Sequence, residues 1–248
     1  MSKIKKAFHI LKSFFIQSVH AVRKAFGLYS VVTVTDLNRV DPISTYFGID
    51  RGRPIDRYYV EKFLYQNRKY IKGRILEIAE DTYSTRYARL NETAKEEPIV
   101  ETLHYDKTAE KVTIIGDLTK PETLPENSYD CFICTQVYNF IFDVSKALEG
   151  SYQLLKKGGV LLAAVAGISQ ISRQDMIKWG DYWRFTNKSI EALLNNTKFS
   201  QVEIVPMGNV MVSCAFLQGI ALEELPHKEL LDETDENFQI IIGIKAVK

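Results

Sequence analysis

Hydrophobic positions follow three successive patterns along the chain, and the first is helical. Over the first 27 residues, apolar side chains recur at every third or fourth position, which is the spacing of one stripe along an α-helix. Lysines and arginines occupy the other side, and no acidic residue precedes Asp36. The pattern therefore predicts a basic amphipathic helix over residues 1–30. Its stripe comprises Ile4, Phe8, Leu11, Phe15, Val19, Val22 and Phe26.

This helix has two competing interpretations. It packs on its own domain or on a second copy of the chain in a homodimer, or residues 1–26 lie on the anionic inner surface of a membrane, which attracts basic amphipathic helices. Charged residues interrupt the apolar ones too often for the segment to span a bilayer.

The second pattern covers residues 31–72 and begins with a β-prone run at 28–37. The stretch at 47–64 reads FGIDRGRPIDRYYVEKFL. It is too polar for a core and too regular for a linker, and Pro54 suits the first position of a helix that continues to about Gly73. We interpret 31–72 as a lid segment and helix that fold over a ligand.

The third pattern, from residue 73 to 248, alternates short apolar runs with amphipathic segments. The runs are nearly continuous in Val, Ile and Leu, which is typical of parallel strands buried on both faces. The fold class is therefore α/β, with a doubly wound, mostly parallel sheet and helices on both faces. Strands are predicted at 74–80, 100–106, 111–118, 129–137, 158–167, 200–209 and 238–248, and helices at 82–90, 143–157, 187–197 and 211–225.

Acidic and polar residues follow the predicted strands, where ligands bind in open parallel sheets. A phosphate or nicotinamide dinucleotide site would instead show a glycine-rich turn, exposed amides and a lysine. The row favours a ligand with hydroxyl groups and positive charge, such as a nucleoside with a cationic centre. Its members are Glu77, Ala79 and Asp81 after the first strand, Asp106 after the second, Asp117 and Leu118 after the third, and Gln136 and Tyr138 after the fourth.

Composition excludes several classes of function. The 248 residues are 46% hydrophobic and 25% charged, as in an ordinary globular protein. The net charge is +1 and the basic residues gather in the first segment, which argues against nucleic acid as the acceptor. Three cysteines and no secretory cleavage site indicate the cytoplasm. Cys131 and Cys134 lie three apart on a predicted strand and so face opposite sides, and no metal site is predicted.

Six motifs along residues 47–248 carry a resemblance to a known family. They are FGIDRGRPIDRYYVEKFL, GRILEIAEDTYSTRYA, VTIIGDLT, YDCFICTQVYNFIFDVSKAL, LLKKGGVLLAAVAGISQISRQDMIKWGDYWRFT and the closing IKAVK. The chain resembles the class I S-adenosylmethionine-dependent methyltransferases, and most of all the bacterial type 11 group often associated with polysaccharide assembly. WGDYWRFT is the most specific motif, whereas LKKGGVLL is shared across the superfamily.

The resemblance implies a Rossmann-like domain over 73–248, an antiparallel last strand and S-adenosylmethionine as cofactor. It places Glu77 and the following turn, with Ala79 and Asp81, at the methionine part. Asp106 would bind the ribose, and Asp117 with the Leu118 amide would read the adenine. Gln136 would line the site beyond the fourth strand.

One departure concerns the turn after the first strand. The family has alternating glycines after the acid, and Ala79, Asp81 and Tyr83 stand at those positions here. Glycine permits close backbone approach to a ligand, so we expect the turn to take another path. Arg57 and Tyr58 in the preceding stretch are predicted to hold the cofactor in its place, through its carboxylate and by stacking.

Aromatic residues in WGDYWRFT indicate where the acceptor binds. Tyr182, Trp183 and Arg184 are predicted to bind a small or saccharide-like acceptor, because sugars often stack on aromatic faces. Transfer to a hydroxyl also needs a base, for which Asp181 is the first candidate and Tyr138 the second. His104, within a strand, is interpreted as a core histidine.

Two functions follow, of different classes. The first is a cytoplasmic methyltransferase that O-methylates a small or saccharide-like acceptor, with peripheral contact to the inner membrane surface if residues 1–26 lie on lipid. The alternative is a catalytically inactive scaffold or partner subunit at the membrane, which the loss of all three glycines would favour.

Overall fold

The computed structural model describes residues 22, 26, 40–94, 96–106 and 112–248. The predicted helix at 1–30, apart from two isolated residues, and the β-prone run at 28–37 lie outside this part of the chain. Both expectations therefore stay predictions.

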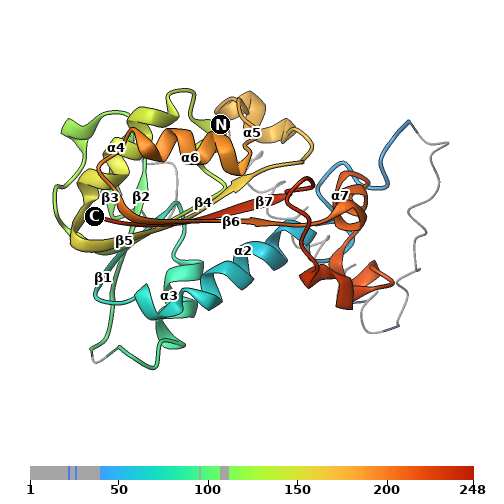
Figure 1. Ribbon diagram of the computed structural model, residues 1–248, viewed down its shortest axis with the longest axis horizontal. Helices are drawn as coiled ribbons and strands as arrows, with labels where there is room; N and C mark the ends of the chain where they lie inside the picture. Colours follow the sequence, from blue (N-terminus) through green and yellow to red (C-terminus); the bar gives the residue numbers. More distant parts are fainter. Residues whose placement is uncertain (1–21, 23–25, 27–39, 95, 107–111) are drawn as a thin grey trace, which may run out of the picture.

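A seven-stranded sheet in the order β3-β2-β1-β4-β5-β7-β6 forms the centre of the molecule (Figure 1). Strands β1 to β5 run parallel, and β7 runs antiparallel to both β5 and β6. The predicted α/β class, parallel sheet and antiparallel last strand are thus confirmed. The strands are β1 Arg74–Ile78, β2 Ile99–His104, β3 Ile114–Ile115, β4 Tyr129–Thr135, β5 Leu155–Ala166, β6 Ser200–Met207 and β7 Ile241–Val247.

Helices cover both faces of the sheet (Figure 1). One hydrophobic cluster joins α2, α3 and α7 to the sheet, and a second joins α4 and α6 to the other face. The central strands are apolar on both sides for this reason. The helices are α2 Ile55–Gln66, α3 Thr82–Arg89, α4 Val144–Leu154, α5 Arg173–Lys178, α6 Asn187–Asn195 and α7 Val210–Leu217.

Two predicted elements differ from those observed, and one observed helix was not predicted. Strand β3 keeps only two of its eight predicted residues, because the chain turns at Asp117, whose amide donates to Thr123 Oγ1 at 2.9 Å. The helix predicted to reach 225 ends at Leu217, and Gly219 adopts a φ of 68° immediately after it. The short helix α5 was not predicted, because its six residues show too little periodicity.

The stretch at 47–64 is built into the main core instead of forming a separate segment. Its helix α2 contributes Ile55, Tyr59 and Phe63 to the same hydrophobic cluster as α7, and the Phe63 ring packs so close to Gly243 on β7 that a Cβ there would lie 2.5 Å from it. The boundary predicted at residue 72 therefore coincides with no break in the core.

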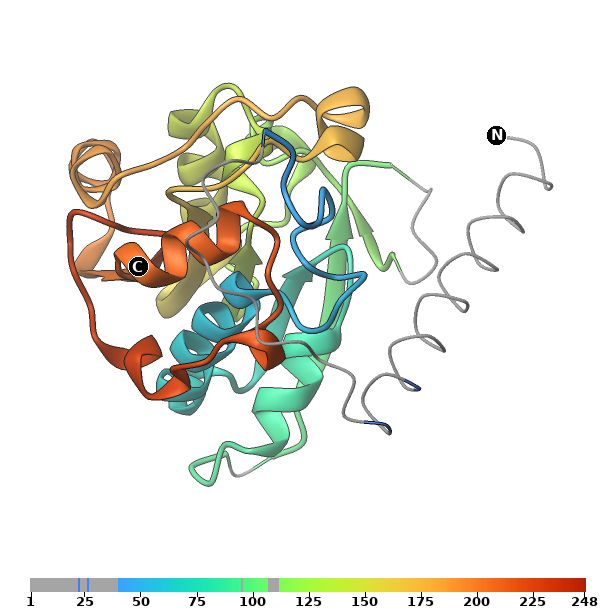
Figure 2. The same cartoon turned by 90° about the vertical axis from the view of Figure 1, so that its right-hand side faces the viewer.

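Charged residues before α2 fasten this stretch to the segment after α7 (Figure 2). The Arg51 guanidinium donates to both carboxylate oxygens of Glu224, at 2.9 and 2.5 Å. Arg53 accepts a backbone hydrogen bond from Leu222, and Pro54 bridges Ala221. The arginines and acids in this region chiefly pair with other parts of the protein.

Candidate functional site

A cavity of about 1140 Å³ opens at the carboxyl ends of the strands. Its walls come from the turns after β1, β2, β3 and β4, from the loop that leads to α4, and from the end of α5 with the residues that follow. Five predicted site residues meet here although they are far apart in sequence: Ala79, Asp81, Asp117, Leu118 and Gln136. Tyr182 joins them from the far side.

Two turns at this edge of the sheet have unusual backbone conformations. Ala79, after β1, has a φ of 66°, and Gln136, after the neighbouring β4, has a φ of 56°. Side-chain-bearing residues are disfavoured in this left-handed region, and such strain gathers at functional sites. The expectation that the β1 turn takes another path is wrong at Ala79, which keeps a conformation typical of glycine.

Glu77 lies on β1 and is 5% exposed. Its carboxylate accepts hydrogen bonds from the Ser84 amide at 2.7 Å, the Ser84 hydroxyl at 2.6 Å and the Tyr83 amide at 3.2 Å. Burial raises the pKa of Glu77, against the opposing effect of these hydrogen bonds. The carboxylate thus accepts the hydrogen bonds of the first turn of α3 and is not part of the cavity lining. These donors are the buried partners that a carboxylate in an apolar strand requires.

Asp56, in the first turn of α2, meets Gln136 at the cavity edge. Gln136 Nε2 donates to Asp56 Oδ2 at 3.3 Å, and the Arg57 amide donates to Asp56 Oδ1 at 2.8 Å. Burial raises the pKa of Asp56. Gln136 Oε1 is buried and has no hydrogen-bond partner among the described residues. Sequence analysis did not single out Asp56, because a contact across 80 positions leaves no local signal.

Hydrogen bonds and an ion pair fix the side chain of Asp117 in the turn after β3. Asp117 Oδ1 accepts from the amide and hydroxyl of Thr119, at 2.9 and 2.8 Å, and Oδ2 lies 3.2 Å from Lys120 Nζ. Burial alone would raise the pKa of Asp117, but these contacts lower it. Leu118 is 5% exposed and lines the cavity beside it. The two residues predicted to read an adenine therefore share one wall.

Aromatic side chains make up much of the remaining cavity lining, and most of them were not predicted. The Trp179 ring, at the end of α5, makes edge contacts with Tyr105 at 4.6 Å and His104 at 5.8 Å between ring centroids. Phe142 meets Tyr182 in the same way at 5.5 Å. All five line the cavity.

His104 was interpreted as a core histidine, and it lines the cavity instead. Its Nδ1 lies 2.9 Å from Asp106 Oδ1. Asp106, the predicted ribose ligand, therefore interacts with His104 and is not itself in the lining. The sequence signal that could have found Trp179 was the WGDYWRFT motif itself, in which we weighted the second tryptophan over the first.

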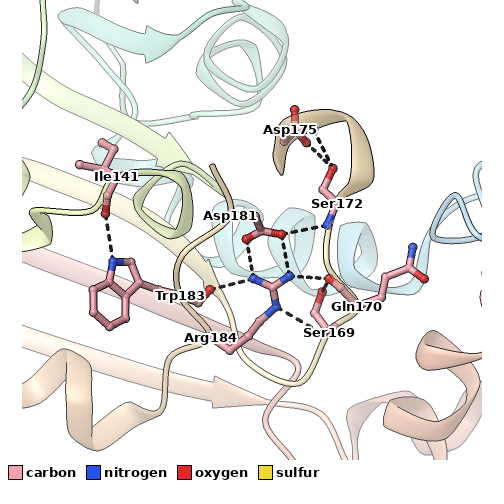
Figure 3. Close-up of polar contacts among 8 residues, drawn as sticks. All are labelled: Ile141, Ser169, Gln170, Ser172, Asp175, Asp181, Trp183 and Arg184. Atoms are coloured by element: carbon pink, nitrogen blue, oxygen red, sulfur yellow. Dashed lines mark hydrogen bonds and ion pairs between the residues drawn. The ribbon is translucent and has the colours of Figure 1, made fainter. Parts of the chain in front are cut away.

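Asp181 and Arg184 tie the loop between β5 and α6 together (Figure 3). The guanidinium donates to both carboxylate oxygens, at 2.6 and 2.8 Å, and the Ser172 amide donates to Asp181 Oδ2 at 2.8 Å. Arg184 also donates to the carbonyl oxygens of Ser169 at 3.3 Å and Gln170 at 2.5 Å. We call these five residues the loop clamp.

The loop clamp leaves Asp181 poorly suited to act as a base. The side chain is 1% exposed and is not part of the cavity lining. Burial would raise the pKa of Asp181, but the hydrogen bonds from Arg184 and Ser172 lower it. Arg184 is likewise occupied within the loop. Trp183 donates from Nε1 to the carbonyl oxygens of Ile141 and Phe142, at 3.1 and 3.2 Å, so it anchors the loop while Tyr182 faces the cavity.

Three more predicted site residues lie away from the cavity lining. Tyr138 is fully buried, its hydroxyl lies 2.7 Å from Ser151 Oγ in the core, and burial holds its pKa well above the usual value, which argues against a role as base. The Tyr58 hydroxyl donates to Asp232 at 2.5 Å, on the surface. The Arg57 side chain is exposed. The geometry supports none of these three as a ligand-binding group.

Over the described ranges, no helix has the length and apolar character needed to cross a bilayer. No group of three or more potential metal-binding side chains occurs there either.

Comparison with known proteins bears on the domain and its fold. Residues 72–163, from just before β1 to the middle of β5, match the type 11 methyltransferase model described as "Methyltransferase domain". A search of curated protein sequences gives no significant match.

Two solved structures show the same fold at low sequence identity. A SAM dependent methyltransferase from Archaeoglobus fulgidus is 12% identical with a TM-score of 0.50, over 77% of this chain and 94% of that one. Phosphoethanolamine N-methyltransferase 2 from Haemonchus contortus, in complex with S-adenosyl-L-methionine, is 16% identical with a TM-score of 0.50, over 87% of this chain and 55% of that one. The domain match and the fold confirm the expectation of an S-adenosylmethionine-dependent methyltransferase with S-adenosylmethionine as cofactor.

Proposed function

We propose that the protein transfers a methyl group from S-adenosylmethionine to a hydroxyl group of a small, saccharide-like acceptor. The observation that carries this proposal is the mixed lining of the cavity, in which polar residues follow the strands and the aromatic residues Phe142, Trp179 and Tyr182 come from the loop before α4 and the residues after α5. Pockets for one small ligand measure about 300 to 1000 Å³. A volume of about 1140 Å³ therefore has room for the cofactor and an acceptor together.

The polar side suits the cofactor. Asp117 and Leu118 offer a carboxylate and an amide on one wall, as reading an adenine edge requires. Ala79, Asp81 and Gln136 lie at the neighbouring turns after β1 and β4, with an unpaired acceptor atom at Gln136. When bound there, S-adenosylmethionine supplies an electrophilic methyl group on its sulfonium.

The aromatic side suits the acceptor. Phe142 is 69% exposed and Tyr182 is 51% exposed, so both present apolar ring surface to an incoming molecule. Sugar rings stack on such faces through their C–H groups while their hydroxyls remain free to bond. The loop clamp and the Trp183 anchor hold this wall in place, so the contribution of the protein is to orient the acceptor near the methyl group.

The scaffold alternative is weaker than the sequence suggested. It rested on the missing glycines of the β1 turn, yet Ala79 keeps a glycine-like φ of 66° and remains in the cavity lining. A chain that had lost its ligand would have no reason to retain this strained conformation beside a buried, unpaired Gln136 oxygen.

Calorimetric titration tests the cofactor first. Micromolar binding of S-adenosylmethionine and S-adenosylhomocysteine, about −8 kcal/mol, with no binding of NADH, is the expected result. Absence of binding by all three ligands would favour the scaffold.

Transfer from methyl-labelled cofactor tests the acceptor. We expect labelling of a sugar or nucleotide-sugar in a panel that also holds phenols and amines. The Phe142→Ala variant should lower kcat/KM for that acceptor by about three- to tenfold, as lost aromatic contact predicts, with cofactor affinity unchanged. Tyr65→Ala, at a residue of α2 that is 49% exposed and lies outside the cavity lining, is the control. Labelling confined to amines would reject O-methylation.

The membrane interpretation of residues 1–26 requires its own test. Removal of residues 2–26 should abolish binding to vesicles that contain anionic lipid and leave cofactor affinity intact. Retained vesicle binding would show that the basic segment is not the membrane contact, and a change in oligomeric state would favour the homodimer.

A further inference from the structure

The short helix α5 presents apolar side chains to solvent beside the mouth of the cavity. None of its six residues is buried, and Figure 1 shows the helix at the outer edge of the molecule. Ile177 is 89% exposed, and Met176 and the preceding Ile171 are exposed as well. One exposed apolar residue is ordinary, whereas several on one small element mark a surface that meets an apolar partner.

Aromatic side chains continue this surface around the cavity mouth. The exposed Trp183 ring stacks with Phe142 at 5.9 Å between centroids, and Phe142 meets Tyr182 at 5.5 Å. Phe142 and Tyr182 belong to the cavity lining, whereas Trp183 lies outside it. We call the exposed apolar residues outside the lining the apolar rim: Ile171, Met176, Ile177 and Trp183.

The loop clamp fixes the apolar rim in its exposed position. Arg184 donates to the Gln170 carbonyl, and the Ser172 amide donates to Asp181, so the backbone is held on both sides of Ile171. The indole nitrogen of Trp183 donates to the Ile141 carbonyl at 3.1 Å. Because these bonds hold the loop, its apolar side chains are ordered for a partner before the partner binds.

The charges on α5 indicate the chemistry of that partner. Arg173 and Lys178, at its two ends, pair with no carboxylate in the described part of the chain, and Lys178 Nζ lies 4.1 Å from the centroid of the Trp179 ring. The nearby carboxylates of Asp175 and Asp181 accept hydrogen bonds within the loop. Apolar side chains flanked by free cations suit an anionic lipid surface, where tryptophan is also enriched.

The start of the described fold lies beside the apolar rim. Gln170 Nε2 donates to the Thr45 carbonyl at 3.0 Å, next to Ile171 in the sequence. The first 26 residues, whose basic amphipathic pattern suits a membrane surface, are therefore joined to the fold on this side. A lipid surface that one of these segments contacts is within reach of the other, and two linked contacts bind more tightly than either alone.

We propose that the apolar rim, together with Arg173 and Lys178, binds an anionic lipid surface, with the mouth of the cavity next to the lipid. This contact is separate from residues 1–26. It goes beyond the proposed function, because it requires neither cofactor nor acceptor.

Tryptophan fluorescence reports directly on this surface, because the chain has two tryptophans, Trp179 and Trp183. We expect the full chain to bind vesicles of equal parts phosphatidylcholine and phosphatidylglycerol, and brominated acyl chains in these vesicles to quench the fluorescence. Vesicles of phosphatidylcholine alone should bind more weakly, and added salt should weaken binding to the anionic vesicles.

Two variants separate the apolar contribution from the charged one. Ile177→Gln preserves helix propensity and should weaken vesicle binding about tenfold, as expected when one isoleucine is no longer buried. Arg173→Gln should weaken it about fivefold, the effect of one cation near an anionic surface. Ile99→Gln is the control, because Ile99 is 62% exposed at the amino end of β2, outside the cavity lining. It should bind vesicles like the unaltered protein.

Three results would overturn the inference. Vesicle binding without quenching, unchanged in Ile177→Gln and abolished by removal of residues 2–26, would assign the contact to the first segment alone. Quenching that appears only after this removal would mean that the chain covers its own apolar rim. Absence of vesicle binding in both forms would leave no lipid contact at all. The vesicle assay contains no cofactor, so failure of cofactor binding would reject the proposed function and leave this result standing.

Discussion

Two carboxylates near the carboxyl ends of the strands are held in opposite ways. Asp181 in the loop clamp receives two guanidinium nitrogens and a backbone amide, and its pKa is lowered despite burial. Asp56 at the cavity edge receives two neutral donors, and burial raises its pKa. The backbone differs in the same sense, because the clamp places Gly180 at a φ of 87°, whereas the cavity edge places Ala79 and Gln136 in the left-handed region.

Whether a carboxylate is satisfied within the protein distinguishes a structural residue from a functional one more clearly than residue type does. In the loop clamp every charge has a partner, and the left-handed residue next to Asp181 is Gly180. This region therefore contains no group that requires a ligand. At the cavity edge a charge, an amide oxygen and two backbone positions are all in unfavourable states. Strain and unsatisfied groups persist in folded proteins where a ligand or a reaction uses them.

Breaking the loop clamp should have the largest effect on stability. Arg184→Met leaves the Asp181 side chain, which is 1% exposed, with only neutral donors, the Ser172 amide and the Asn139 side chain. Loss of one partner of a buried pair should lower the free energy of unfolding by about 3 kcal/mol, measured by urea denaturation. Lys188→Met is the control, because its pair with Glu191 is exposed and should contribute little to stability. Equal effects of both variants would mean that the clamp contributes no more than a surface pair.

Glu77 is intermediate between Asp181 and Asp56. Its replacement should lower the free energy of unfolding by less than Arg184→Met does. It is buried like Asp181 but is satisfied by neutral donors of α3. Glu77→Ala leaves two amides and the Ser84 hydroxyl without their acceptor, which should cost about 2 kcal/mol of unfolding free energy. Glu77→Gln keeps one acceptor oxygen and should lose less. Hydrogen exchange of the Tyr83 and Ser84 amides gives a local readout, and unchanged exchange in Glu77→Ala would contradict the capping role.

The pH dependence of stability should sharpen the contrast between Asp56 and Asp181. The pKa of Asp56 is raised on folding, so its favourable contribution is complete below the unfolded pKa of about 3.9 and is lost as the pH rises through the folded pKa. Asp56→Asn should therefore become more stable relative to the unaltered protein as the pH rises from 4 to 8. The charged and titratable groups that interact with Asp56 in the described part of the chain are Arg57 and Tyr83.

Asp181 should show the opposite trend. Its pKa is lowered on folding, so its contribution is present above the unfolded pKa of about 3.9 and is lost as the pH falls through the folded pKa. The deficit of Asp181→Asn should be complete at neutral pH and shrink in acid. Thermal denaturation of both variants from pH 3 to 8 measures the two slopes, and slopes of the same sign would remove the contrast.

The sequence predicted the sheet and its ligand edge well, because both depend on local patterns. Continuous Val, Ile and Leu identified the buried strands, and the residues after them include five that line the cavity. It also located the return of the chain over the crevice through WGDYWRFT, from which Trp179 and Tyr182 face the cavity.

The sequence could not show which polar residues were already satisfied. Asp181 was predicted to be a base, although its partner Arg184 stands only three positions away, because burial and hydrogen-bond geometry are not visible in a pattern. The Asp56–Gln136 contact joins residues 80 positions apart and has no local signature. The path of the turn at Ala79 was predicted from the residue type, because glycine is absent there. The strands on either side set the backbone conformation instead.

The smallest expected effect concerns this backbone strain. Ala79→Gly should raise the free energy of unfolding by about 0.5 to 1 kcal/mol, because relief of a left-handed conformation outweighs the greater freedom of glycine in the unfolded chain. Gly180→Ala in the loop clamp, at a φ of 87° and with the Tyr182 ring 2.4 Å from the added Cβ, should destabilise the protein by more than about 1 kcal/mol. Urea denaturation measures both. A loss of stability in Ala79→Gly would mean that the Ala79 conformation carries no strain, and the cavity edge would then owe its distinction from the loop clamp to Asp56 and Gln136 alone.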